Sequence, residues 1–216
     1  MRIKSEGNCN FCKDTFSNIS IGRHLQSCEK RIKAHNSEKK SGKRYLLKAG
    51  AGPFWVYFEV DTQNTLEKVD DFLRNLWLDC CGHLSAFKID EQTYSYDQQE
   101  EFGDKSMRFP LHKVISPGQT FSHEYDFGTT TYLTLKCISE REGETKKINI
   151  LARNNLPHFP CHTCKKTPAR DICSQCLWES KSMFCAHCAK KHKCDEEMFL
   201  PVVNSPRMGM CGYTGE

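Results

Sequence analysis

The sequence predicts an α+β fold in which a central antiparallel sheet carries one main helix and small cysteine-rich modules flank it. Three observations in the 216-residue chain lead to this prediction. The middle of the chain contains runs of alternating apolar residues and one long amphipathic stripe. Cys-x-x-Cys pairs followed by histidine and cysteine occur near both ends instead. We expect four segments: a first module at 1–31, a basic linker at 32–44, a domain at 45–156 and a second module at 157–216.

Charge is distributed unevenly along the chain, whose formal net charge is +4. Residues 1–48 carry 12 Lys/Arg and 4 Asp/Glu, a net charge of +8, whereas residues 49–155 carry 11 and 17, a net charge of −6. Only the N-terminal segment is therefore expected to attract an anionic partner. No apolar run approaches the ~20 residues that span a bilayer, so we expect a soluble protein without membrane contact.

The paired cysteines near both ends, which together with Cys28 and Cys194 make ten of the 14 in the chain, are expected to bind metal rather than to form disulfides. The chain opens with MRIKSEGNCN, which lacks the apolar run of a secretory signal. We therefore expect a cytoplasmic protein, because thiols stay reduced there and paired cysteines usually hold metal.

The first module contains Cys9, Cys12, His24 and Cys28 in the ligand order of a Cys-Cys-His-Cys zinc finger. Its order of elements resembles the ββα finger family with two cysteine and two histidine ligands. Two features depart from that family: the last ligand is cysteine, and eleven rather than twelve residues separate Cys12 from His24. Phe16 lies where such a finger keeps a core apolar residue, as does Ile21.

The finger resemblance implies that three helix positions face nucleic-acid bases, namely Ser17, Ser20 and Arg23. Arginine can form two hydrogen bonds with guanine, whereas serine discriminates poorly between bases. Lys39 and Lys40 belong to the basic stretch that follows, which is either a solvated linker or an arm that tracks phosphates. One finger covers only ~3 base pairs, so this module suits a protein partner as well as DNA.

The central domain is expected to begin with a strand, FWVYFEV at residues 54–60, which is rich in β-branched and aromatic residues. A capping signal at 64–67 precedes the main helix. The apolar stripe of that helix comprises Leu66, Val69, Phe72, Leu73, Leu76, Trp77 and Cys80, the last of which we expect to fill the core. Residues 86–89 and 93–95 form a predicted hairpin, and after an acidic loop at 97–104 three strands at 121–127, 132–139 and 147–153 form a predicted meander.

Two phrases of this domain, TLEKVDDFLRNLWLDCCGHLSAFKID and PGQTFSHEYDFG, resemble the plasmid pRiA4b ORF-3-like family. The resemblance covers Tyr45–Asn155, and its most specific parts are Gly82-His83-Leu84-x-x-Phe87 and Tyr125-Asp126-Phe127-Gly128. It also extends to the C-terminal VVNSPRMGMCGYTG. The resemblance implies an α+β domain and a link to mobile elements, since some members are passenger proteins of such elements.

The sequence of this chain differs from that family at several positions in and near these two segments. Family members commonly carry Asp, Trp and His where this chain has Thr129, Thr131 and Leu133, and a second histidine where it has Ser85. His83 and Asp126 alone are too few for a catalytic metal site, which needs about three protein ligands. We therefore expect a structural histidine at position 83 and a turn-stabilising carboxylate at position 126.

The last module contains three Cys-x-x-Cys pairs at an interval of twelve residues, followed by His192 and Cys194. The pairs are Cys161/Cys164, Cys173/Cys176 and Cys185/Cys188. Eight soft ligands suffice for two closed tetrahedral zinc sites. The ligands either fill the sites sequentially or alternate between them in a cross-brace, and MYND, HIT and B-box fingers, which this module resembles, are interleaved. His162, His187 and Cys211 are not assigned as ligands.

The leading hypothesis is a non-enzymatic protein with three zinc ions, zinc-stabilised modules at both ends and no catalytic residue. Its basic N-terminal segment would bind nucleic acid, and its C-terminal module would bind a protein. The alternative is a metal-dependent hydrolase or nuclease that uses His83, His123, Asp126 and the acidic loop. A redox sensor is a weaker hypothesis, because thiolates that hold metal are not free to react.

Overall fold

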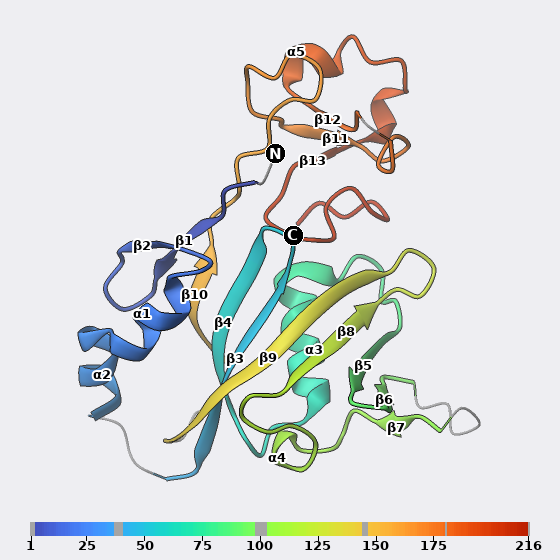
Figure 1. Ribbon diagram of the computed structural model, residues 1–216. Helices are drawn as coiled ribbons and strands as arrows, with labels where there is room; N and C mark the ends of the chain where they lie inside the picture. The colour runs from blue at the N-terminus through green and yellow to red at the C-terminus, as the bar shows by residue number, and fades with distance from the viewer. Residues whose placement is uncertain (1–2, 37–40, 98–102, 144–146, 180, 216) are drawn as a thin grey trace.

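The computed structural model describes residues 3–36, 41–97, 103–143, 147–179 and 181–215, and it confirms the mixed α+β fold (Figure 1). The main strands are β1 (Glu6–Cys9), β2 (Thr15–Ser17), β3 (Lys43–Ala51), β4 (Phe54–Asp61), β5 (Ser85–Ile89), β6 (Gln92–Ser95), β7 (Lys105–Ser106), β8 (Thr120–Tyr125), β9 (Thr131–Glu142) and β10 (Asn149–Asn154). Among the described residues they form one ten-stranded sheet in the order β2-β1-β10-β4-β3-β9-β8-β5-β6-β7. Neighbouring strands are antiparallel except β6 and β7. A short helix, α4 (Leu111–Val114), precedes β8.

One face of this large sheet is covered by the main helix, as the apolar stripe predicts. Helix α3 (Leu66–Leu73) continues into a π-helical turn, η1 (Arg74–Leu78). Thr65 caps the helix by accepting a hydrogen bond from the Lys68 N–H at 3.3 Å. Trp77 is fully buried in the larger of the apolar cores, between the helix and the central strands.

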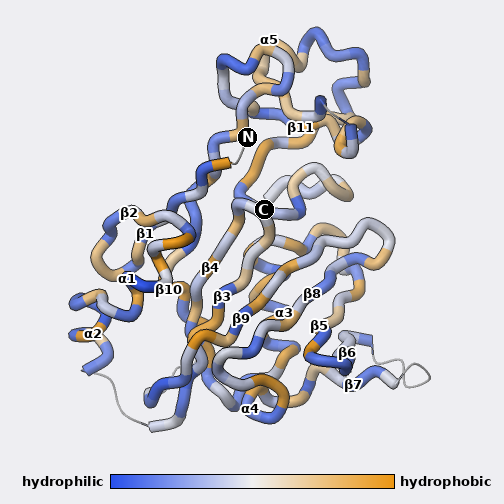
Figure 2. The backbone as a smooth tube through the Cα atoms, in the orientation of Figure 1, coloured by the Kyte–Doolittle hydropathy of each residue, from blue (hydrophilic) through white to orange (hydrophobic). Residues whose placement is uncertain are grey.

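The opposite face is partly covered by the N-terminal module, which contributes helices α1 (Ile21–Ser27) and α2 (Glu29–Asn36). Leu25 of α1 is buried in a second apolar cluster with Trp55 and Tyr57. These two β4 residues point away from α3, because side chains alternate between the faces of a strand. In Figure 2 the central strands carry apolar residues, whereas α2 is mostly hydrophilic.

The predicted meander through the last two strands is wrong. Strand β9 pairs with β8 and β3, whereas β10 pairs with β4 and β1. The β3–β4 hairpin lies between β9 and β10, so these two strands are not neighbours. The local pattern predicts a strand in each of these segments to within a few residues, although it misses β3. The neighbour of a strand, by contrast, depends on residues far along the chain. Most of the predicted acidic loop lies outside the described residues.

The segment predicted to be a basic linker, residues 32–44, is only partly a linker. Helix α2 continues to Asn36 and β3 begins at Lys43, whereas positions 39 and 40 lie outside the described residues. Arg31 of α2 is buried and donates a hydrogen bond to Glu59 of β4 at 2.6 Å. This contact fixes α2 to the sheet.

The C-terminal module contains a small second sheet, at the top of Figure 1. Its strands are β11 (Asp171–Cys173), β12 (Met183–Phe184) and β13 (Phe199–Pro201), joined by α5 (Ala186–Ala189) and η3 (Glu196–Met198). Phe159 packs on Phe54 of β4 with ring centroids 6.1 Å apart. The chain then returns to the large sheet, where Arg207 and Met208 are buried.

We expect the substitution Gly7→Ala to loosen the N-terminal module from the large sheet. Gly7 is buried opposite Asn154 in the β1–β10 pair, and an added Cβ would lie 2.1 Å from the Arg153 carbonyl oxygen. Because neither atom can rotate away, the strands must shift, at a cost of about 1–3 kcal/mol in the free energy of unfolding. Chemical denaturation and amide exchange in β1 measure this loss. Gly128→Ala is the control, since its Cβ would meet nothing closer than 3.4 Å, and equal effects of the two changes would contradict the prediction.

Candidate metal centres

The N-terminal group brings together Cys9, Cys12, His24 and Cys28, the four predicted ligands. Their ligand atoms lie within 4.8 Å of one another, with Cys9 Sγ 3.9 Å from Cys28 Sγ and Cys12 Sγ 3.3 Å from His24 Nε2. Tetrahedral zinc, with Zn–S bonds of ~2.3 Å, requires about 3.8 Å between two sulfurs and about 3.6 Å between sulfur and nitrogen. This group could therefore hold a metal ion with only small movements of its ligands.

Strands β1 and β2 and helix α1 position these ligands in the predicted ββα order. The turn between the first two cysteines closes with the Lys13 N–H donating to the Cys9 carbonyl at 2.9 Å. Phe16 stacks on the His24 ring with centroids 3.8 Å apart, and Ile21 is fully buried. These two apolar residues hold the helix against the hairpin, as the sequence predicts.

The C-terminal module contains two groups whose ligands interleave along the chain. One group is Cys161, Cys164, Cys185 and Cys188, and the other is Cys173, Cys176, His192 and Cys194. Cys164 Sγ lies 3.9 Å from Cys185 Sγ. Cys176 Sγ lies 3.6 Å from Cys194 Sγ and 3.4 Å from His192 Nε2. The module therefore has the cross-brace arrangement and not the sequential one.

Aromatic rings explain why His192 belongs to the second of these groups. Helix α5 ends at Ala189, so helical periodicity does not carry His192 to the same face as Cys188. Its imidazole instead packs between Phe184 and Phe199, with ring centroids 4.5 and 5.7 Å away. The rings of β12 and β13 thus fix this ligand.

Hydrogen bonds favour the thiolate form of Cys164. The Thr167 hydroxyl lies 3.3 Å from Cys164 Sγ, and this bond, with the Lys166 and Thr167 N–H groups, lowers the pKa of the thiol to about 5. A metal ion binds cysteine as the thiolate, so these donors would favour metal binding through Cys164. All fourteen cysteines are free, so none is held in a disulfide.

Two neighbouring histidines lie outside both groups, in agreement with the sequence analysis. His162 Nδ1 accepts hydrogen bonds from the Ser182 and Met183 N–H groups at 3.2 and 3.3 Å. Burial, and then the charge of Lys165, lower the pKa of His162. His187 is exposed on α5.

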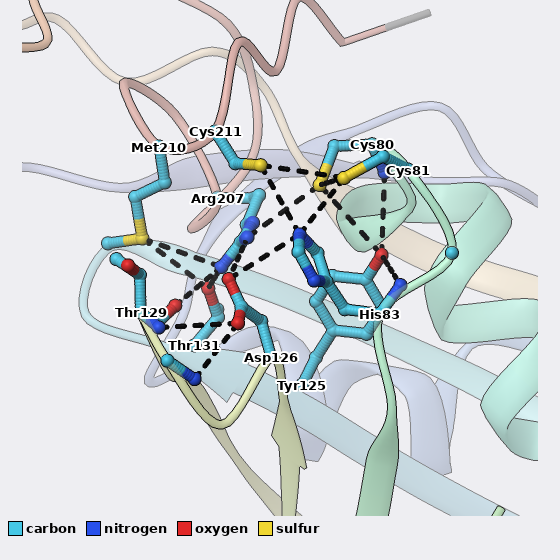
Figure 3. Close-up of polar contacts among 12 residues, drawn as sticks. Cys80, Cys81, His83, Tyr125, Asp126, Thr129, Thr131, Arg207, Met210 and Cys211 are labelled. Atoms are coloured by element: carbon cyan, nitrogen blue, oxygen red, sulfur yellow. Dashed lines mark hydrogen bonds and ion pairs between the residues drawn. The ribbon is translucent and has the colours of Figure 1, made fainter.

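The structure adds a fourth group that the sequence analysis missed: Cys80, Cys81, His83 and Cys211 (Figure 3). The expectations that Cys80 only fills the core and that His83 is only a structural histidine are therefore incomplete. A run of two cysteines with a histidine two residues later is the only local signal. The last ligand lies 128 residues after His83, so no spacing rule could have connected it.

The residues of the hydrolase hypothesis do not form one cluster. His83 Nε2 lies 3.6 Å from Asp126 Oδ2. Asp126 Oδ1 accepts a hydrogen bond from the Gly128 N–H at 3.0 Å, which confirms its turn-stabilising role. His123 is fully buried, and its Nε2 lies 2.6 Å from Asp70 Oδ1, so it is not accessible to a substrate in this structure.

The structure describes three of the five residues that were predicted to contact nucleic acid. The hydroxyl oxygens of Ser17 and Ser20 lie 2.9 Å apart and hydrogen bond to each other. Arg23 is exposed on α1. Lys39 and Lys40 lie outside the described residues.

No helix within the described residues is long and apolar enough to cross a membrane.

The sequence matches no protein-family model, and no curated protein matches it. Among solved structures, the chain is similar to a protein of unknown function, MM3350, from Methanosarcina mazei Go1, with a TM-score of 0.44 and 15% identity. The similarity covers 52% of this chain and 68% of that one.

Proposed function

We propose that the protein is a non-enzymatic, zinc-stabilised binding protein. It binds nucleic acid on the face of the large sheet opposite α3, where the N-terminal module leaves that face uncovered. Zinc ions in the three predicted groups would each have four protein ligands, and such closed sites support structure rather than catalysis. The observation that carries the nucleic-acid proposal is a pair of lysines, Lys48 and Lys136, that face each other on this sheet.

Lys48 of β3 and Lys136 of β9 are directly opposite in the strand register. Both point away from the larger core, because their neighbours Leu47 and Leu135 are buried in it. Like charges directly opposite in a sheet are destabilising. Burial, and then the charge of Lys136, lower the pKa of Lys48. Ion pairs within the described residues involve Lys43 but neither of these two lysines.

The lysine pair lines a cavity of about 370 Å³ between the N-terminal module and the sheet. Asn18 of the module and Trp55 of β4 also line it. A phosphate group in this cavity would neutralise the two lysines, which is the contact that dominates nucleic-acid affinity.

An exposed aromatic residue extends the same face and favours a nucleic acid over a simple anion. Tyr132 is 62% exposed and lies on the same face of β9 as Thr134 and Lys136. Exposed aromatic rings stack on nucleic-acid bases, and this stacking tolerates any sequence.

We expect the double substitution Lys48→Gln/Lys136→Gln to weaken nucleic-acid binding without loss of stability. Anisotropy titrations of the full zinc-loaded chain, with labelled single- and double-stranded DNA and RNA, are run across a salt series. Loss of two phosphate contacts should reduce the slope of log affinity against log salt by about 1.4 on single strands and about 1.8 on duplex DNA. Removing the like-charge pair leaves the free energy of unfolding unchanged or raises it.

Lys88→Gln is the matched control, because Lys88 is an exposed lysine of the same sheet that already pairs with Glu124 at 2.7 Å. It should leave the salt slope unaltered. The nucleic-acid proposal would be contradicted if the unaltered chain did not bind at low salt. It would also be contradicted if the double variant and the unaltered chain had equal slopes of log affinity against log salt.

For the C-terminal module we propose a protein partner. Trp178, two residues after the ligand Cys176, is 75% exposed, and tryptophan is enriched at the centres of protein interfaces. We expect the substitution Trp178→Ala to abolish binding of the protein partner while nucleic-acid binding is retained.

The proposed cytoplasmic location fits the free thiols. Membership of the pRiA4b ORF-3-like family, and with it an accessory role for mobile elements, is proposed from the two sequence phrases.

A further inference from the structure

The fourth group of ligands forms where the C-terminal tail returns to the large sheet (Figure 3). Cys80 and Cys81 follow η1, His83 precedes β5, and Cys211 lies in the tail. Cys81 Sγ is 3.8 Å from Cys80 Sγ and 3.5 Å from Cys211 Sγ. His83 Nε2 is 3.0 Å from Cys81 Sγ and 3.2 Å from Cys211 Sγ. The corresponding separations in the three predicted groups are 3.3 to 3.9 Å, so the fourth group has closely similar dimensions.

We propose that Cys80, Cys81, His83 and Cys211 bind a fourth metal ion, a soft divalent ion such as zinc, which fastens the C-terminal tail to the central domain. Three thiolates and one imidazole form the ligand set that such ions prefer. The tail has no regular secondary structure after β13, so an ion would supply a fixed point that backbone pairing does not.

The backbone supports this assignment. Gly82, which follows Cys81, has a φ of 73°, and Lys13 and Lys165, which follow the second cysteine of two predicted pairs, have φ values of 72° and 58°. Cys211 itself has a φ of 49°, which is uncommon for a residue other than glycine. Backbone strain of this kind persists where the surroundings enforce it, and a metal–sulfur bond would do so.

A buried ion pair lies directly behind the group. Arg207 of the tail is fully buried, and its Nη2 donates to Asp126 Oδ2 at 2.5 Å and lies 3.6 Å from Cys80 Sγ. Asp126 Oδ2 in turn lies 3.6 Å from His83 Nε2. An outer contact such as that of Arg207 with Cys80 orients a metal ligand. Arg207 is therefore a positioning residue, which holds the tail so that Cys211 reaches the other three ligands.

The fourth group is more exposed than the other three. Cys81 and Cys211 are exposed, whereas each of the three predicted groups contains at least two buried ligands and no exposed one. A chelator reaches an exposed ion more easily than a buried one. The fourth ion should therefore leave first, and its loss should free the tail while the other modules stay folded.

The test is the metal content of the full chain, loaded with zinc under reducing conditions and dialysed, measured by mass spectrometry of the metal. We expect four equivalents in the unaltered chain and three in Cys211→Ser and in Cys81→Ser. Because both side chains are exposed, neither substitution should unfold the protein. Cys137→Ala is the matched control, since Cys137 is buried in the core, belongs to none of the groups and should not alter the four equivalents.

Amide exchange across residues 205–215 is the second measurement. Exchange should accelerate in Cys211→Ser, and in the unaltered chain when the first equivalent is chelated, but not in Cys137→Ala. Three equivalents in the unaltered chain, or four in Cys211→Ser, would overturn the proposal. A disulfide between Cys81 and Cys211 in the zinc-loaded protein would also overturn it, because it removes two ligands. None of these readouts depends on nucleic-acid binding.

Discussion

Replacing Cys185 by serine is expected to release two metal equivalents rather than one, and to unfold the C-terminal module while the large sheet stays folded. Cys185 is buried and belongs to the first of the two interleaved groups. Serine retains the size of the side chain but not the thiolate that a metal ion requires. The substitution therefore removes a ligand without creating a large cavity.

We expect the C-terminal module to depend on bound metal ions, because the buried cluster that is its own is formed mainly by ligands. Its buried cluster consists of five cysteines that are ligands and of Phe184. Its three strands contain only two or three residues each. A structural zinc ion contributes about 10–16 kcal/mol to the folding of a small module. Whole domains are stable by only about 5–15 kcal/mol, so we expect the module to unfold when such ions are removed.

Interleaving explains why both equivalents should leave. Cys173 and Cys176 of the second group lie in the chain between the two pairs of the first group, Cys161/Cys164 and Cys185/Cys188. When the first group opens, the segment before Cys173 and the segment after Cys176 both lose their fixed ends. In a sequential arrangement each ion would close its own loop, and a single substitution would release a single equivalent.

Metal analysis combined with amide exchange of residues 157–204 measures this outcome. Cys137→Ala again serves as the control for loss of a buried thiol, and it should retain every equivalent. Loss of one equivalent only, or protected amides in the module at saturating chelator, would show that the two groups fold independently or that the module needs no metal.

The predicted groups of ligands depend largely on local sequence. The Cys-x-x-Cys pairs are turns in which two ligands lie three residues apart, so sequence spacing alone brings them together. The apolar stripe from Leu66 to Trp77 is local in the same sense, because helical periodicity places its members on one face. Both features are present in the structure where they were predicted.

The failures concern contacts between distant parts of the chain. Strand β10 pairs with β4 rather than with β9, and the choice depends on where the β3–β4 hairpin lies. Arg207 meets Asp126 across 81 residues, and Cys211 meets His83 across 128. A contact between residues this far apart cannot be predicted from the periodicity or spacing within one segment. The role of the tail therefore became clear only in three dimensions.

Substituting Glu59 by glutamine is expected to destabilise the protein by about 3–5 kcal/mol, the cost of removing one partner from a buried ion pair. The Glu59 side chain is only 2% exposed, and it accepts hydrogen bonds from three arginines. The distances are 2.6 Å to Arg31 of α2, 2.6 Å to Arg141 of β9 and 3.4 Å to Arg44 of β3. One carboxylate thus joins the N-terminal module to three strands of the large sheet. Glutamine keeps its shape but brings an N–H₂ donor towards these guanidinium groups.

Glu140→Gln is the matched control, because Glu140 is an exposed carboxylate of β9 that pairs with Lys43 at 2.8 Å. An ion pair at the surface contributes about 0–1 kcal/mol, so this change should be nearly neutral. Chemical denaturation at neutral pH compares the two variants. Equal losses of stability would contradict the prediction.

The pH dependence of the Glu59→Gln difference provides an independent test. Burial raises the pKa of Glu59, but hydrogen bonds from Arg141 and Arg31 outweigh it and lower the pKa to about 2. An unfolded glutamate has a pKa of about 4.3. The stabilisation is therefore fully present above that value and is lost as the pH falls towards 2. The stability difference between the unaltered chain and Glu59→Gln should shrink across this window, whereas acid release of metal affects both proteins alike. A difference that stays constant down to pH 2 would show that Glu59 stabilises the sheet by packing and not by its charge.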